Sequence, residues 1–337
     1  MSHIARWDLD KTYLRTEFDS LRDIVRTALE RPDEKRTNPG ASTLLREMVR
    51  AGVSVHILSG SPEQMRRRLE DKLRLDGITW DSFTLKPNLQ NLLRLRFRAV
   101  KDQLGYKLPA LLIAHEKSVA SSGSAPSSKE TLFGDDAEAD AFVYSLYGDI
   151  VGGRIAEETL RDVCEKGRVY PDVLELILAK ARNIAPVETV ERILIHLERQ
   201  SPPDDFRIYG ARAVPFYNYL QAAFIVFEDG RLPAEAVLRV AVELVVQHRF
   251  DGDGLARSYG DLVRRGHLRG LAVDALESAY AGWADREKVP GQAELRAMLT
   301  RLPKVAEGAK ASFRGDEALA TPDYAKLVLG HNSRRKK

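Results

Sequence analysis

The first 150 residues alternate short apolar runs with longer amphipathic stretches, and this alternation restricts the fold more than any other feature of the chain. Short apolar runs of the kind found in buried strands occur at residues 4–9, 53–58, 78–85 and 130–133. Helical periodicity fills the intervals, at residues 41–51, 62–75, 89–104 and 108–119. We therefore predict an α/β fold, a Rossmannoid parallel sheet with helices on both faces.

The pattern changes after Gly152–Gly153, where we find helical periodicity alone. Helices are predicted at residues 157–165, 171–181, 186–198, 215–227, 233–248 and 268–283, several of them with proline near the first turn. We predict an all-helical domain that follows the α/β domain, and then a basic, partly disordered tail. The expected boundaries are 1–153, 154–304 and 305–337.

The net charge and the cysteine content limit the classes of protein to which the chain can belong. The formal net charge is +3, and the four basic residues 334–337 account for all of it. Such a balance does not favour nucleic-acid or membrane binding. The single cysteine, Cys164, excludes an intrachain disulfide and a cysteine metal cluster, as is usual in a reducing compartment.

The start of the sequence has no basic-then-apolar signal pattern, and its longest apolar runs are too short to cross a bilayer. We therefore expect a cytoplasmic protein without a transmembrane segment.

Three polar clusters each follow an apolar run. They occupy residues 8–12 (Asp-Leu-Asp-Lys-Thr), 59–62 (Ser-Gly-Ser-Pro) and 134–140 (Gly-Asp-Asp-Ala-Glu-Ala-Asp). In an open parallel sheet, ligands bind at the carboxyl ends of the strands, so one sheet could bring all three clusters to one crevice.

These residue types suit phosphoryl transfer. A carboxylate such as Asp8 can attack phosphorus, and a second one, Asp10, can protonate the leaving oxygen and later activate water. Paired acids repel an anionic substrate, so Mg²⁺ is expected, with Asp135 and Asp136 as further carboxylates. Ser59 offers its hydroxyl and nearby backbone N–H groups to phosphate oxygens.

Taken together, the clusters resemble the motifs of the haloacid dehalogenase (HAD) superfamily. The matching residues are Asp8, Asp10 and Thr12 in the first motif, Ser59 in the second, and Asp135 and Asp140 in the fourth. Within that superfamily they are similar to the catalytic domain of the phosphatidate phosphatases associated with actin patches. The resemblance covers residues 4–150.

The resemblance implies a HAD-like fold and a role for each matching residue. Asp8 would be the nucleophile and Asp10 the general acid and base, while Asp8, the Asp10 carbonyl and Asp135 would hold Mg²⁺. Thr12, Ser59, Gly60 and a lysine would bind the substrate, and Asp140 would orient the metal or the lysine. Lys107 precedes a predicted helix and then the fourth motif, as the family pattern requires, with Lys86 and Lys129 as competitors.

The sequence thus predicts a phosphatase, a hydrolase of phosphate monoesters. It leaves no room for a large inserted cap over the crevice, which suits a bulky substrate such as a phospholipid or a macromolecule. The segment after residue 153 would dock that substrate or merely support the sheet. The alternatives are a HAD fold used as a weakly catalytic binding or scaffold module, and a phosphatase for nucleic-acid ends. The natural substrate and the oligomeric state do not follow from the sequence.

Overall fold

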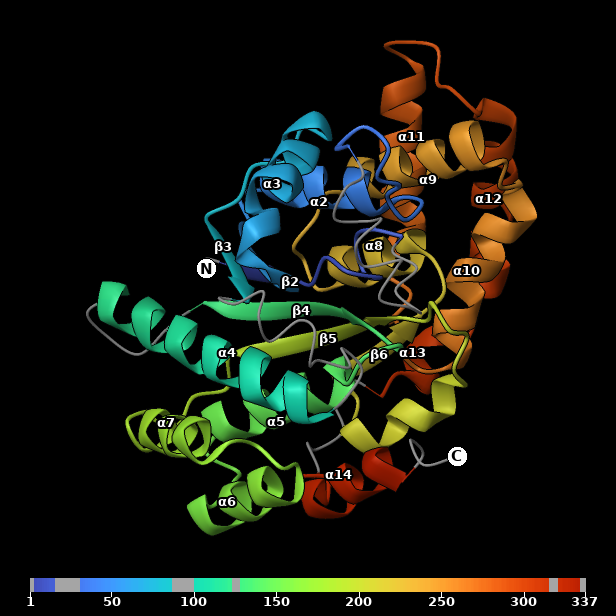
Figure 1. Cartoon of the computed structure of the whole chain (residues 1–337). Coiled ribbons are helices and arrows are strands. Elements are labelled where there is room, and N and C mark those ends of the chain that lie inside the picture. Colours follow the sequence, from blue (N-terminus) through green and yellow to red (C-terminus); the bar gives the residue numbers. More distant parts are fainter. Residues whose placement is uncertain (1–2, 16–30, 87–99, 123–127, 315–320, 334–337) are drawn as a thin grey trace.

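A six-stranded parallel sheet forms the centre of the protein, which we describe from a computed structural model (Figure 1). The structure describes residues 3–15, 31–86, 100–122, 128–314 and 321–333. In spatial order the strands are β3 (Ser82–Lys86), β2 (Ser54–Pro62), β1 (His3–Trp7), β4 (Lys129–Asp135), β5 (Val190–His196) and β6 (Ala213–Phe216). The predicted α/β class with a parallel sheet is confirmed.

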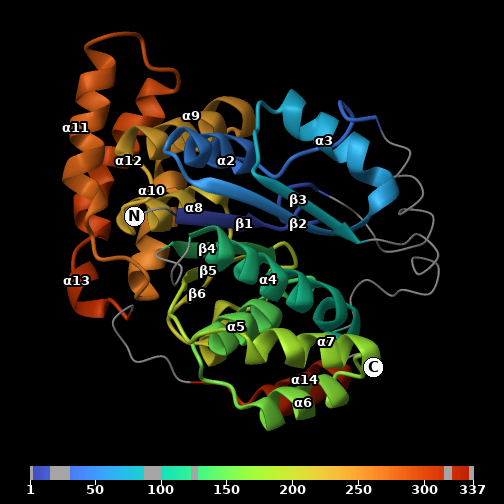
Figure 2. The same ribbon diagram turned by 90° about the vertical axis from the view of Figure 1, so that its left-hand side faces the viewer.

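Helices cover both faces of the sheet (Figures 1 and 2). One face carries α2 (Ala41–Arg50), α3 (Arg66–Leu75), α8 (Tyr219–Glu228) and α9 (Ala234–His248), with α10 (Gly252–Arg264), α11 (Ala272–Ala284) and α12 (Gln292–Val305) packed outside them. The other face carries α4 (Val100–Ser122), α5 (Asp140–Val151), α6 (Glu157–Lys166), α7 (Pro171–Arg182) and α14 (Tyr324–Ser333). Each face therefore has its own hydrophobic core.

The expectation that only helices follow residue 153 is wrong in two places. Residues 186–198, expected as a helix, contain β5, and the start of the expected helix 215–227 belongs to β6. Periodicity alone cannot separate a short buried strand from a buried helix. The deciding feature of β5 is its content of Val190, Ile193 and Ile195, because β-branched side chains favour strands.

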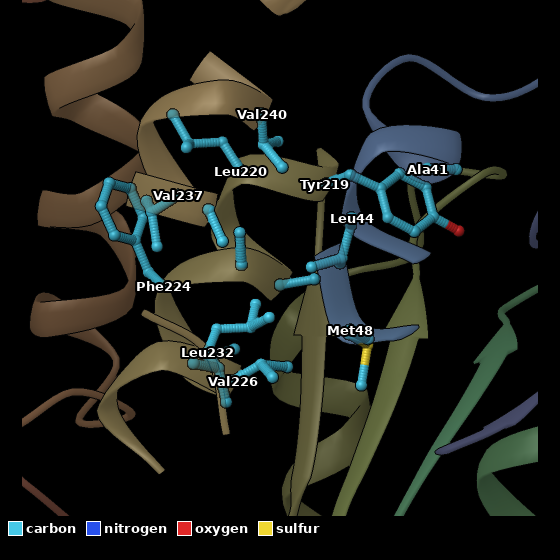
Figure 3. Close-up of a cluster of buried hydrophobic side chains, with 14 of the residues drawn as sticks. Ala41, Leu44, Met48, Tyr219, Leu220, Phe224, Val226, Leu232, Val237 and Val240 are labelled. Carbon is cyan, nitrogen blue, oxygen red and sulfur yellow. The ribbon is translucent and has the colours of Figure 1, made fainter. Parts of the chain in front are cut away.

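One hydrophobic cluster joins residues on both sides of the expected boundary at residue 153. Leu44 and Met48 of α2 belong to the same cluster as Leu220 of α8 and Val240 of α9, and all four side chains are fully buried (Figure 3). Because β5 and β6 also extend the sheet beyond β4, the boundary falls inside a shared structure. The part after residue 153 thus completes the sheet as well as adding helices.

Two other segments differ from expectation. The two helices expected at residues 89–104 and 108–119 form one described helix, α4, which continues through Pro109, while residues 87–99 lie outside the described part. In the expected tail, α13 (Ala309–Ser312) and α14 are helical, and Tyr324 of α14 is buried and donates a hydrogen bond to Asp149. No helix in the described ranges is both long enough and apolar enough to span a membrane.

We predict that a fragment of residues 1–153 does not fold. It would lack β5 and β6 and would uncover the apolar faces that α8 and α9 bury. The free energy lost with this burial is far larger than the typical free energy of unfolding of a domain. Circular dichroism during heating should show a cooperative transition for the full chain and none for the fragment. Cooperative unfolding of the fragment would mean that the first 153 residues form an independent domain after all.

Candidate active site

The three polar clusters meet where the strand order reverses. The chain runs outward from β1 to β2 and β3, then crosses back to β4 on the other side of β1. Asp8 follows β1 directly, and its backbone N–H donates to the Phe133 carbonyl of β4 at 3.0 Å. Asp135 is the last residue of β4. The two carboxylates therefore lie at the carboxyl ends of adjacent strands, the usual ligand position in such a sheet.

The turn after β1 is fixed by residues from distant parts of the chain. Lys11 has a left-handed backbone with a φ of 63°. The Asn38 amide donates to the carbonyl oxygens of Lys11 at 3.0 Å and of Thr12 at 2.7 Å. The Tyr219 hydroxyl of α8 also donates to the Thr12 carbonyl, at 2.5 Å. Together these contacts hold the turn that carries Asp8 and Asp10.

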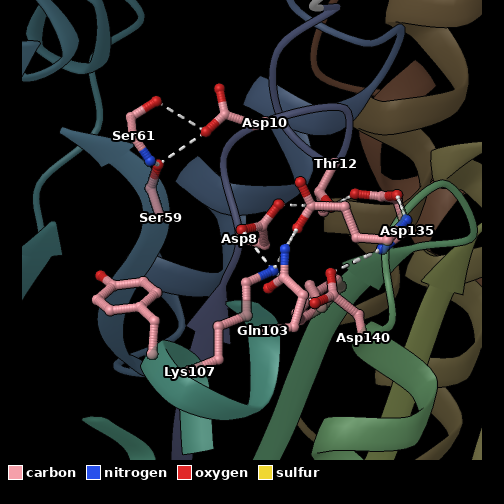
Figure 4. Close-up of polar contacts among 12 residues, drawn as sticks. Asp8, Asp10, Thr12, Ser59, Ser61, Gln103, Lys107, Asp135 and Asp140 are labelled. Atoms are coloured by element: carbon pink, nitrogen blue, oxygen red, sulfur yellow. Dashed lines mark hydrogen bonds and ion pairs between the residues drawn. The ribbon is translucent and has the colours of Figure 1, made fainter. Parts of the chain in front are cut away.

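Three aspartates form a buried cluster (Figure 4). One oxygen of each of Asp8, Asp135 and Asp140 lies within 4.8 Å of the others, and each residue is at most 1% exposed. The Thr12 hydroxyl lies 3.2 Å from Asp8 Oδ2 and 3.4 Å from Asp135 Oδ2. Asp140 Oδ2 accepts the backbone N–H of Asp135 at 3.2 Å, which ties the start of α5 to the end of β4.

Lys107 of α4 reaches into this cluster and is fully buried. Its Nζ lies 3.1 Å from Asp8 Oδ1, 2.5 Å from Asp140 Oδ1 and 3.1 Å from Glu138 Oε2. Neither competing lysine is placed in this way. Lys129 donates to the Glu188 carbonyl at the opposite end of β4, and the Lys86 ammonium lies 6.0 Å from the ring centre of Tyr106. Among the three candidates, the geometry thus favours Lys107.

Burial and mutual repulsion shape the charges of the cluster. Burial raises the pKa of Asp8 well above its usual range, Lys107 opposes this, and Asp140 adds to it. Burial also raises the pKa of Asp135 strongly, and that of Asp140 to about 6. Burial disfavours the Lys107 ammonium, but Asp140 and Asp8 outweigh this and raise its pKa well above the usual range. When its carboxylates are ionised, the cluster therefore carries a net negative charge.

The cluster fits a hard cation. Asp8, Asp140 and Glu138 contact the Lys107 ammonium, and Asp135 lies beside Asp8 and Asp140, so four carboxylates share one positive charge. Within the described part of the chain, Asp8 Oδ1 accepts no well-formed hydrogen bond, although Lys107 Nζ is 3.1 Å away. A buried carboxylate oxygen without a donor costs free energy unless a cation approaches it. Carboxylate oxygens are ligands for hard cations, so the three clustered aspartates could hold a metal ion.

Asp10 points toward β2. Its Oδ2 accepts the hydroxyls of Ser59 at 2.9 Å and Ser61 at 2.8 Å, and the Ser61 N–H donates to Ser59 Oγ at 3.0 Å (Figure 4). Burial raises the pKa of Asp10, and the two hydroxyls partly oppose the shift. Between the serines, a methyl group added at Gly60 would meet no atom of a described residue within 4 Å. Within the described part of the chain, the space beside the Gly60 Cα is therefore open.

The acidic residues within 134–140 have two different roles. Asp136, expected as a metal ligand, accepts the backbone N–H groups of Arg199 at 2.8 Å and Ser201 at 3.0 Å, and it is not one of the three clustered aspartates. It ties the turn after β4 to the loop after β5. Asp140, expected only to orient other groups, takes the third position in the cluster.

Two residues of the site were not predicted from the sequence. Glu138 contacts Lys107, and the Gln103 amide, one turn before Lys107 on α4, donates to the same Glu138 oxygen. The position of Glu138 within the acidic run was a usable signal. Gln103 had no signal apart from its four-residue spacing from the lysine.

No protein-family model matches the chain, and searches of curated proteins and of solved structures gave no significant match. The chemistry of the site therefore rests on the residues and contacts described above.

We predict that Gly134→Ala destabilises the protein. A methyl group at Gly134 would lie 2.5 Å from Asp140 Cβ, so the aspartate or the strand has to shift. Such overpacking costs about 1–3 kcal/mol, which urea denaturation would measure. Gly105→Ala on α4 is the matched control, because no described residue outside the neighbouring helix backbone lies within 4 Å of the added methyl group. Equal stability of the two variants would contradict the tight contact at Gly134.

Proposed function

We propose that the protein is a Mg²⁺-dependent phosphate monoester hydrolase of the HAD type that acts through an aspartyl-phosphate on Asp8. The observation that carries this proposal is the contact between the buried Asp8 Oδ1 and the Lys107 ammonium, which lie 3.1 Å apart. Asp8 can act as a nucleophile, and the nearby cation lowers the repulsion that an anionic substrate meets.

The proposed reaction has two displacements. In the first, an oxygen of Asp8 forms a bond to phosphorus while the bond from phosphorus to the ester oxygen breaks. Asp10 gives its proton to the departing oxygen, and the raised pKa of its buried carboxyl favours the protonated form that this step needs. In the second, Asp10 takes a proton from water, the water oxygen bonds to phosphorus, and the bond to Asp8 breaks.

Other residues of the chain would bind and orient the phosphoryl group. Lys107 and the Ser59 hydroxyl would contact its oxygens, and Thr12 would hold Asp8 through the contact at 3.2 Å. Asp8, Asp135 and the Asp10 carbonyl would hold Mg²⁺, which neutralises part of the charge of carboxylates and phosphate. Asp140 and Glu138 would position Lys107, since both contact its ammonium group.

A direct test is acid quenching with a ³²P-labelled aryl phosphate in the presence of Mg²⁺. The proposal expects label on the protein in a form that hydroxylamine releases, as an acyl phosphate requires, together with steady release of inorganic phosphate. A panel of lipid, nucleotide, sugar and protein phosphates would then define the substrate. A folded, Mg²⁺-loaded protein that hydrolyses none of these esters would exclude the proposed activity and favour the binding or scaffold alternative.

Asp10→Asn should slow the hydrolysis of alkyl phosphates more than that of p-nitrophenyl phosphate. A nitrophenolate leaves without help, whereas an alkoxide needs the proton that Asp10 supplies, and general acid catalysis contributes about 10²–10⁴-fold. Burst measurements of leaving-group release isolate the first displacement, because loss of the base also slows the second. A uniform decrease of the burst rate for both esters would argue against the acid role of Asp10.

A further inference from the structure

A small cavity lies at the β6 edge of the sheet, on elements that carry none of the residues assigned to the reaction above. Its volume is about 80 Å³. It is enclosed by η3 (Pro203–Tyr209), by Ala213 and Pro215 of β6, by the turn between α10 and α11, and by Arg314. We call it the β6-edge cavity (Figure 1 shows the strand and its neighbours).

Arginines dominate the charged wall of this cavity. Arg207, Arg265 and Arg314 line it, and Asp204 is its one acidic lining residue in the described part of the chain. The Arg207–Asp204 pair is 61% and 75% exposed, so water and salt screen it. Arg265 is the most buried of the three, at 12% exposure. A guanidinium that faces an enclosed space is a donor for oxyanions.

Arg265 is held in place from two sides. Its Nη1 donates to the Pro215 carbonyl at 2.7 Å, and its Nε donates to Asp261 at 2.9 Å. Its Nη2 lies 2.6 Å from the same Asp261 oxygen but makes no well-formed hydrogen bond to any described residue. The guanidinium is thus held in a fixed position at the cavity wall.

His267 also lines the cavity, and its pKa reflects the positive charges around it. Its pKa is lowered to about 3 by burial and by the positive charges of four arginines at positions 192, 207, 265 and 314. The imidazole is therefore neutral at physiological pH and can donate one N–H without adding charge.

The volume of the β6-edge cavity limits the size of the ligand that it can hold. A buried water needs roughly 10–15 Å³ of such space, so about 80 Å³ admits several waters or one tetrahedral oxyanion.

We propose that the β6-edge cavity binds one tetrahedral oxyanion of the phosphate type, either free or as the terminal group of a larger ligand. The guanidinium groups of Arg265, Arg207 and Arg314 and the His267 ring supply the donors. The site is separate from the Asp8 centre and does not depend on the function proposed for it.

Histidine-selective NMR of the full chain, in EDTA, tests this site apart from the Asp8 centre. The His267 signal is assigned by its loss in His267→Asn, and inorganic phosphate is titrated at constant ionic strength against chloride. We expect a saturable shift of the His267 signal with phosphate and not with chloride. The double variant Arg207→Gln/Arg314→Gln should need at least tenfold more phosphate, whereas Arg264→Gln, an exposed arginine outside the cavity wall, should respond like the unmodified chain.

Glycerol 3-phosphate in a parallel titration distinguishes the two sources of the anion. Tighter binding than inorganic phosphate indicates a larger phosphorylated ligand, and weaker binding indicates the free ion. A His267 signal that does not move with either compound overturns the proposal. So does an equal shift with chloride, or a double variant that folds and titrates like the unmodified chain.

Discussion

Replacing Asp8 by asparagine should lower turnover of an aryl phosphate by at least ~10³-fold, a loss of ~4 kcal/mol of transition-state stabilisation. An amide oxygen is a poor nucleophile and cannot form the proposed acyl phosphate. The fold should survive, because asparagine has nearly the same volume and removes one of several buried negative charges. The measurement is steady-state release of nitrophenolate, with urea denaturation of both proteins to show that the variant is folded.

Asp136→Asn is the matched control for this experiment. It makes the same chemical change at the same edge of the sheet, but Asp136 binds the backbone of Arg199 and Ser201 and is not one of the clustered aspartates. We expect its activity to stay close to that of the unmodified protein. Substantial turnover in folded Asp8→Asn would eliminate Asp8 as the nucleophile. Equal losses in both variants would point to a general charge effect.

The position of the site was predictable because strand direction fixes it. Asp8 and Asp135 each follow a run of apolar residues, and the carboxyl ends of parallel strands meet at one edge of a sheet. Nothing else in the sequence was needed to bring these two side chains together. The same argument applies to Ser59 on β2, which contacts Asp10.

Side-chain direction within the acidic run was not predictable from spacing. Asp135 Oδ1 accepts the N–H groups of Ala137 and Glu138 at 2.6 and 2.9 Å, and this tight turn directs Asp136 toward the loop after β5. The partners of Asp136, the backbone N–H groups of Arg199 and Ser201, come from a loop more than 60 residues further along the chain. Spacing within the acidic run does not reveal such a long-range contact.

The contribution of the second half of the chain to the candidate site was also not predictable from the sequence. Tyr219 of α8 closes the turn after β1 through the Thr12 carbonyl, across more than 200 residues of sequence. It stacks on Trp7 with ring centres 5.8 Å apart. Such a contact depends on how helices pack on a sheet, which local periodicity does not describe. The segment expected either to dock a substrate or to support the sheet thus helps to build the turn of the candidate site.

Removal of divalent metal should abolish activity, and Mg²⁺ should restore it. The reason is the excess of carboxylate at the site, where Asp135 and the three acidic groups that contact Lys107 outnumber the single ammonium, so an anionic phosphate is repelled unless a cation is bound. The assay is hydrolysis of p-nitrophenyl phosphate after exhaustive treatment with EDTA and desalting, followed by titration with MgCl₂. Full activity in a preparation shown to be free of metal would refute the role of Mg²⁺.

Metal binding should also be visible without turnover, since any ligand that binds only the folded state stabilises it. At a Mg²⁺ concentration of 100 times Kd the gain is ~2.7 kcal/mol, which thermal or urea unfolding can resolve. Asp135→Asn should raise the Mg²⁺ concentration for half-maximal activity at least tenfold, because it removes one of the three clustered oxygen donors. Asp136→Asn should leave that concentration nearly unchanged, since its carboxylate binds two backbone N–H groups instead. If the two variants need the same Mg²⁺ concentration, the metal does not bind at the cluster of Asp8, Asp135 and Asp140.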